Sequence, residues 1–213
     1  MIALAKIPYN QDISFILVVV SFLLISLIKG VYWKHAKLFF MGVFAQRYAN
    51  QYLREENAFT ERVDLITFLL MCVNFTLLIA KLQSVMDVLS MVLVFSLVVL
   101  YFLVKIALIQ ILGSLFKVQD LAKLARFFSL IFDKTLGFVL FPLAVISYFF
   151  VFDITFAVLI ISFSFFIILL ILKLFWLWEI GTNSFGLSNF YIFLYLCVLE
   201  IFPLLLLARG VIY

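Results

Sequence analysis

The 213-residue chain is 68% hydrophobic and 12% charged, with a mean hydropathy of +1.32. Soluble globular domains are roughly 45–50% apolar and about 25% charged, so this composition excludes a water-soluble protein. The formal net charge of +4 would suit nucleic-acid binding in a soluble chain. Here the basic residues cluster between apolar runs, so we expect no nucleic-acid partner and favour contact with the lipid bilayer and its anionic headgroups.

Six apolar runs are long enough to cross a bilayer as helices, and each is bounded by charged or turn residues. The predicted spans are 13–28, 65–80, 85–104, 135–151, 154–174 and 187–208. Only Phe152 and Asp153 separate the fourth and fifth runs, so one very long helix is the alternative there. We expect a single all-α transmembrane domain, 1–213, that forms a polytopic helix bundle with loops at 29–64 and 105–134.

The distribution of basic residues predicts the orientation of these spans. Twelve of the 15 Lys and Arg residues fall in the two long loops or near the end of the fifth span. The positive-inside rule places these segments in the cytoplasm. Trp33, Trp176 and Trp178 lie at the same ends, as expected of tryptophan at a membrane interface. We therefore predict a multi-pass membrane protein with both termini on the side away from the cytoplasm, which is the periplasm if the membrane is the inner (cytoplasmic) membrane of a bacterium.

The first loop carries aromatic residues at a helical spacing. They recur every four residues: Phe40, Phe44, Tyr48 and Tyr52. This pattern predicts an amphipathic helix that lies in the headgroup plane or docks a partner. The mixed charges that follow indicate a salt-bridged turn or a docking surface: Arg54, Glu55, Glu61 and Arg62. A weaker pattern at 121–131 predicts a second interfacial helix in the other loop.

Glu200 is the sharpest functional candidate because it falls near the middle of the sixth run. A carboxylate there costs ~2.5–3.5 kcal/mol on insertion scales, so it needs a partner or a proton. One interpretation is a protonatable site for coupling or relay, with Cys197 one turn away on the same face. The other, which we favour, is a protonated carboxyl that joins two helices through a hydrogen bond.

Three further polar residues lie in or beside the predicted spans. Asn74, in the second run, is expected to hydrogen-bond across a helix interface rather than to contact a substrate. Asp87, near the outer end of the third run, either pairs with Lys81 or reaches the headgroups. Lys105, at the inner end of that run, is expected to extend its amine to the interface.

Three functions are compatible with these features, and none involves an evident catalytic residue. No P-loop, GxGxxG or HExxH pattern occurs, and His35 is the only histidine, so we expect no cofactor and no metal. The favoured hypothesis is a non-enzymatic scaffold or accessory subunit that docks a membrane or cytoplasmic protein. The alternatives are a small proton-coupled transporter or channel built around Glu200 and Asn74, which would act as an oligomer, and a lipid- or isoprenoid-handling protein.

Three stretches together carry a family resemblance: QYLREENAFTER at 51–62, FDKTLG at 132–137 with Pro142 after it, and LYLCVLEIFP at 194–203. With them the chain resembles an uncharacterised multi-pass inner-membrane family of Bacteroidota, a domain of unknown function. Asp133 stands where the family's version is expected to have Asn. The resemblance implies a Gram-negative inner membrane and a bundle of six spans, and it implies no activity.

Overall fold

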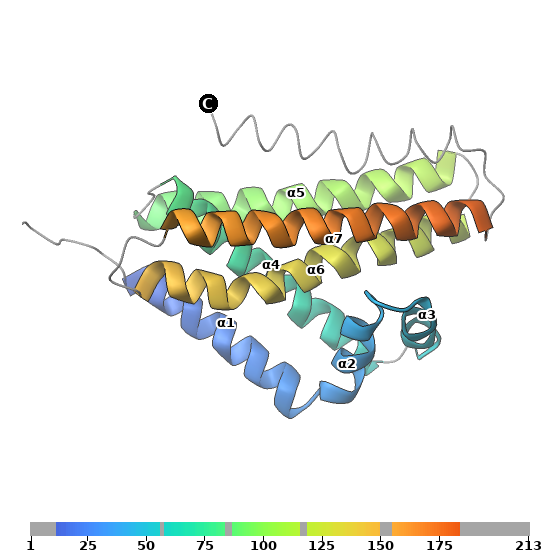
Figure 1. Cartoon of the computed structure of the whole chain (residues 1–213), viewed down its shortest axis with the longest axis horizontal. Helices are drawn as coiled ribbons and strands as arrows, with labels where there is room; N and C mark the ends of the chain where they lie inside the picture. The colour runs from blue at the N-terminus through green and yellow to red at the C-terminus, as the bar shows by residue number, and fades with distance from the viewer. Residues whose placement is uncertain (1–11, 56–57, 84–86, 116–118, 150–154, 184–213) are drawn as a thin grey trace, which may run out of the picture.

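The computed structural model describes residues 12–55, 58–83, 87–115, 119–149 and 155–183, and the regular structure within these ranges is all helical (Figure 1). The helices are α1 (Asp12–Gly30), α2 (Trp33–Met41), α3 (Gln46–Arg54), α4 (Ala58–Leu82), α5 (Val88–Leu115), α6 (Gln119–Phe149) and α7 (Thr155–Asn183). Helices satisfy their own backbone hydrogen bonds, which is why continuous apolar runs adopt them in lipid.

Five of the described helices are long and apolar enough to cross a membrane. Their spanning segments are Asp12–Gly30, Ala58–Leu82, Val88–Ile111, Lys123–Phe149 and Ile160–Glu179. These segments overlap the first five predicted spans, and α6 and α7 pack against each other. The predicted sixth span, 187–208, lies outside the described residues, as do Cys197 and Glu200.

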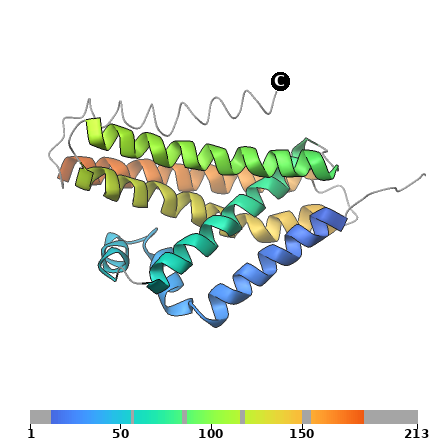
Figure 2. The same cartoon turned by 180° about the vertical axis from the view of Figure 1, so that it is seen from behind.

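Helix α6 is the centre of the bundle. It packs most extensively against α4, and it also contacts α1, α2, α5 and α7. In Figure 1, α5, α6 and α7 run nearly parallel, whereas α1 and α4 are inclined to them. Figure 2 shows α4 crossing obliquely between α1 and the other long helices. Each of the other long helices in the described part of the chain therefore contacts α6, and α1 and α5 also contact α4.

The region between the third and fourth predicted spans differs from the expected loop with a helix of its own. Helix α5 continues to Leu115 and α6 begins at Gln119, so most of 105–134 belongs to these two helices. The apolar side chains of this part of α6 are buried: Ala125, Phe128, Ile131 and Phe132. They pack against α2, α3 and α7. The apolar stripe of a helix is stabilised when protein covers it, so contact with lipid is not required here.

The expected aromatic helix in the first loop is also corrected. Helix α2 ends at Met41, Gly42 caps it by donating its N–H to the Leu38 carbonyl, and α3 begins only at Gln46. A Cβ on Gly42 would lie 3.0 Å from the Ile131 side chain and 3.2 Å from the Ala49 Cα. The missing side chain lets the end of α2 approach both α3 and α6, and the chain turns there.

This turn disperses the four aromatic residues that the sequence pattern placed on one face. Tyr52 is buried against Phe39, with ring centroids 5.5 Å apart, and its hydroxyl donates to the Thr60 carbonyl at 2.9 Å. Phe40 and Tyr48 are half-buried, whereas Phe44 is 77% exposed. An aromatic core, rather than an aromatic stripe, joins α2 and α3 to the bundle.

Candidate functional site

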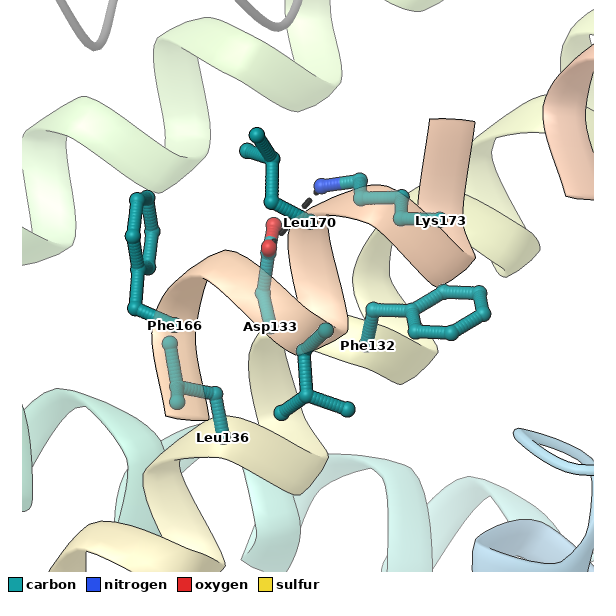
Figure 3. Close-up of a pocket in the computed structure, with 7 residues that line it drawn as sticks. Phe132, Asp133, Leu136, Phe166, Leu170 and Lys173 are labelled. Carbon is teal, nitrogen blue, oxygen red and sulfur yellow. Dashed lines mark hydrogen bonds and ion pairs between the residues drawn. The ribbon is translucent and has the colours of Figure 1, made fainter. Parts of the chain in front are cut away.

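Charged side chains from three helices meet around Asp133 of α6. Lys105 of α5 donates to Asp133 Oδ2 at 2.8 Å, and Lys173 of α7 donates to Asp133 Oδ1 at 2.9 Å. The lysine side chains are each 3% exposed and the aspartate 18%. Figure 3 shows the Asp133 carboxylate turned toward the Lys173 amine. The carboxylate therefore bridges α5 and α7.

A second ion pair lies directly beside the first. Lys134 of α6 donates to the Asp64 carboxylate of α4. The lysine side chain is 1% exposed, and its amine lies 5.9 Å from the Phe39 ring centre and 6.0 Å from that of Phe68. Adjacent residues of a helix lie about 100° apart around its axis, so Asp133 and Lys134 point to different neighbours of α6. We call the five residues Asp64, Lys105, Asp133, Lys134 and Lys173 the charged cluster.

The inward position of Lys105 corrects the expectation that its amine extends to the interface. A buried charge is costly unless it is paired and hydrogen-bonded, and Asp133 supplies both requirements for Lys105. Each member of the charged cluster stands within two residues of an end of a predicted span. The five residues therefore mark ends of predicted spans in the sequence, but nothing in the local pattern indicated that they contact one another.

The space beside the charged cluster is small. A cavity of about 10 Å³ is lined by Phe132, Asp133, Leu136, Phe166, Leu169, Leu170 and Lys173 (Figure 3). A cavity needs roughly 10–15 Å³ to hold one water molecule. This cavity therefore has room for at most one water molecule beside the charged side chains, and it has no room for an organic substrate.

Asn74 occupies the interface of three helices and is fully buried. Its Oδ1 accepts from Ser21 Oγ of α1 at 2.9 Å, and its Nδ2 donates to the Gly137 carbonyl of α6 at 2.8 Å. A Cβ added to Gly137 would lie 2.5 Å from the Met71 Cα of α4. Asn74 thus joins helices where α4 and α6 approach most closely, which is the arrangement expected of a structural amide.

The stretch FDKTLG at 132–137 therefore concentrates the contacts of α6. Asp133 bridges α5 and α7, Lys134 pairs with α4, and Gly137 both admits Met71 and accepts the Asn74 hydrogen bond. Sequence reasoning noticed this stretch only through the family resemblance. Its mixture of two charges and a glycine beside an apolar run was the signal for inward-facing polar contacts.

The outward face of α3 is polar. A surface hollow of about 470 Å³ is lined by Arg47, Asn50, Gln51 and Arg54. At the end of the helix, Glu55 accepts from Gln51 Nε2 at 3.1 Å, and its carboxylate lies 3.7 Å from His35 Nδ1. The exposed Glu61 and Arg62 follow in the first turn of α4. The mixed-charge turn is therefore partly bonded and partly exposed.

A further candidate, Asp87, lies apart from the charged cluster. Asp87 is exposed immediately before α5, and its carbonyl accepts from the Met91 N–H. Lys81, its predicted partner, instead lies over the Tyr148 ring at 5.3 Å from the centroid.

Tyr52 of α3 is a candidate whose ionisation is shifted. Burial and the negative charge of Asp64 raise the pKa of Tyr52 well above its usual value of 10.0.

A family model described as a domain of unknown function (DUF4271) matches residues 14–211. This range includes all five membrane-type helices apart from the first two residues of α1. Comparison with curated proteins and with solved structures finds no match.

Proposed function

The chain belongs to the DUF4271 family, and because membership carries no activity, we propose a function from the molecule itself. It is a non-enzymatic component of the bacterial inner membrane, a scaffold or accessory subunit that docks a protein partner on the cytoplasmic side. The docking surface is the turn between α2 and α3, where Met41 and Phe44 are exposed. Glu61 and Arg62, exposed at the start of α4, provide charged contacts near the same end of the bundle.

The observation that carries this proposal is the exposure of Phe44 on a well-anchored unit. Phe44 is 77% exposed, whereas Phe39, Val43, Ala49 and Tyr52 around it belong to a buried cluster shared with α6 and α7. A large aromatic side chain presented by a fixed backbone loses little conformational freedom on binding. Aromatic anchors of this kind carry much of the binding energy in protein interfaces.

Two polar side chains inside the bundle also support a docking role, because Asn74 and Asp133 each bond to other helices. The cavity beside Asp133 is only about 10 Å³. Polar side chains that join helices in this way are what a rigid membrane anchor requires.

Proton-coupled transport is the second candidate, and the charged cluster is the observation that favours it. Ionisable residues inside membrane spans often serve ion or proton pathways. Asp133 lies in the spanning segment Lys123–Phe149, and Lys173 lies in Ile160–Glu179. The predicted intramembrane carboxyl of Glu200 would be a further titratable group in this mechanism.

The test is a pull-down of the tagged full-length protein from native membranes in a mild detergent. Phe44→Ala is compared with wild type, with Phe163→Ala and with Glu200→Gln. Phe163 is the matched control, because it is 63% exposed on α7, away from the docking surface. A stoichiometric partner that is lost with Phe44→Ala and retained with the other two variants supports docking.

The opposite outcome is equally specific. If no partner is retained by wild type and Glu200→Gln abolishes proton flux in proteoliposomes, the docking proposal fails and transport replaces it.

A further inference from the structure

The hollow on the outward face of α3 has the composition of an anion-binding site. Its lining residues, Arg47, Asn50, Gln51 and Arg54, follow one another at i, i+3, i+4 and i+7. This spacing places them on one stripe of the helix. Ala49 and Tyr52 are buried on the other side of α3, in the cluster shared with α6. The helix is thus held by its apolar side and presents two guanidinium and two amide groups outward.

The positive charge of this unit is not neutralised within it. Residues 33–54 contain four basic residues, Lys34, Lys37, Arg47 and Arg54, and no Asp or Glu. All four are exposed. Within the described part of the chain, neither Arg47 nor Arg54 forms an ion pair. The adjacent acid, Glu55, is half-buried and lies against Gln51 and His35.

The position of α2 and α3 along the chain places this charge beside a membrane surface. The two short helices connect the end of α1 to the start of α4, and both α1 and α4 are membrane-type helices. Because the apolar side of α3 is covered by protein, the surface that remains for lipid is polar. Such a surface matches headgroups rather than acyl chains.

We propose that this hollow binds the phosphoryl group of an anionic phospholipid of the same bilayer. Guanidinium groups bond phosphate oxygens in pairs and keep their charge at any physiological pH. Clusters of basic residues next to a membrane span attract anionic lipids. The Asn50 and Gln51 amides donate to the remaining headgroup oxygens. This site uses none of the residues of the docking surface at Met41 and Phe44, so either proposal can fail without the other.

The test uses the purified full-length protein in neutral detergent, with no other protein present. Binding of phosphatidylglycerol and of phosphatidylcholine is measured by native mass spectrometry for wild type and two double variants. The first is Arg47→Gln with Arg54→Gln, which empties the hollow of charge. The second, Lys34→Gln with Lys37→Gln, removes the same charge from α2 and leaves the hollow intact. Circular dichroism checks that both variants keep the helical content of wild type.

We expect wild type to prefer phosphatidylglycerol and the arginine variant to bind it about 30-fold more weakly, from two lost basic contacts of ordinary strength. The lysine variant should change by less than about 5-fold, since its residues act only through longer-range attraction. Equal losses in the two variants would assign the effect to diffuse charge and overturn the site. Equal binding of the two lipids by wild type would overturn it as well.

A third measurement separates the lipid from a soluble ligand. Glycerol phosphate and inorganic phosphate are added as competitors at the lipid concentration. Retention of phosphatidylglycerol in their presence supports a lipid site. Full displacement by either soluble phosphate would show that the hollow recognises free phosphate and would overturn the assignment to the bilayer.

Discussion

Lys105 of α5 donates to Asp133 of α6 at 2.8 Å, with only 3% of the lysine side chain exposed. The same carboxylate accepts from Lys173 of α7, so three membrane-type helices share one acidic residue. Removing one partner of a buried ion pair leaves an uncompensated charge, which is more costly than the pair itself is favourable.

Asp133→Asn should therefore destabilise the bundle by about 3–5 kcal/mol. The amide cannot neutralise the two amines that face it. The measurement is equilibrium unfolding in mixed micelles as the fraction of dodecyl sulfate rises. Asp87→Asn is the control, because Asp87 is exposed before α5 and its substitution should change stability by less than about 0.5 kcal/mol. Equal midpoints for the two variants would contradict a structural role for the charged cluster.

Gly137→Ala should separate α4 from α6. The new Cβ would lie 2.5 Å from the Met71 Cα, which is backbone and cannot move aside alone. Overpacking of this kind costs about 1–3 kcal/mol or more. Gly30→Ala is the matched control, since a Cβ there meets nothing within 4 Å. Unfolding in mixed micelles should show a large loss for Gly137→Ala and none for Gly30→Ala. A normal midpoint for the first would show that the helices do not approach this closely.

Asn74→Leu should cost about 1–2 kcal/mol, because the Ser21 hydroxyl and the Gly137 carbonyl both lose their partner. A double-mutant cycle with Ser21→Ala isolates one of these hydrogen bonds. The expected coupling is about 0.6 kcal/mol, the average for such bonds in a membrane protein. Strict additivity of the two substitutions would mean that Ser21 and Asn74 do not interact.

Tyr52 should make the protein sensitive to alkaline pH. Its pKa is raised by burial first and by Asp64 second, so the folded state holds the phenolic proton more tightly than the unfolded state does. The stability that this provides is complete below the usual value of 10.0 and is lost as the pH rises beyond it. Tyrosinate absorbance should show that Tyr52 is among the groups that ionise only as the protein unfolds.

Tyr52→Phe should remove that late group and weaken the fold at neutral pH by about 1 kcal/mol, through the lost hydrogen bond to Thr60. Tyr48→Phe, on the same helix but half-buried, should leave the late ionisation in place. If Tyr52 titrates with the other tyrosines before unfolding, the burial of its hydroxyl is wrong.

The sequence by itself determined that the described regular structure is all helical and that five of its helices are long and apolar enough to cross a membrane. Apolar runs long enough for a bilayer have no stable alternative to helices, so five of them appear as membrane-type helices. Charged residues interrupt the apolar runs at 64–65, 104–105, 134–135 and 173–174, but helices α4, α5, α6 and α7 continue through these positions. The role of Asn74 between helices was also predictable, because an amide in lipid needs a partner on another helix.

Only the tertiary structure decided which way the polar side chains turn. A lysine at the end of an apolar run has the same local sequence whether its amine reaches the headgroups or a buried carboxylate, and the rotation of α5 against α6 selects Asp133 for Lys105. The aromatic pattern at 40–52 was likewise compatible with one helix. Helix α2 instead ends at Met41, and Gly42 packs close to Ile131, which is 89 residues further along the chain. A local pattern does not contain a contact of this kind.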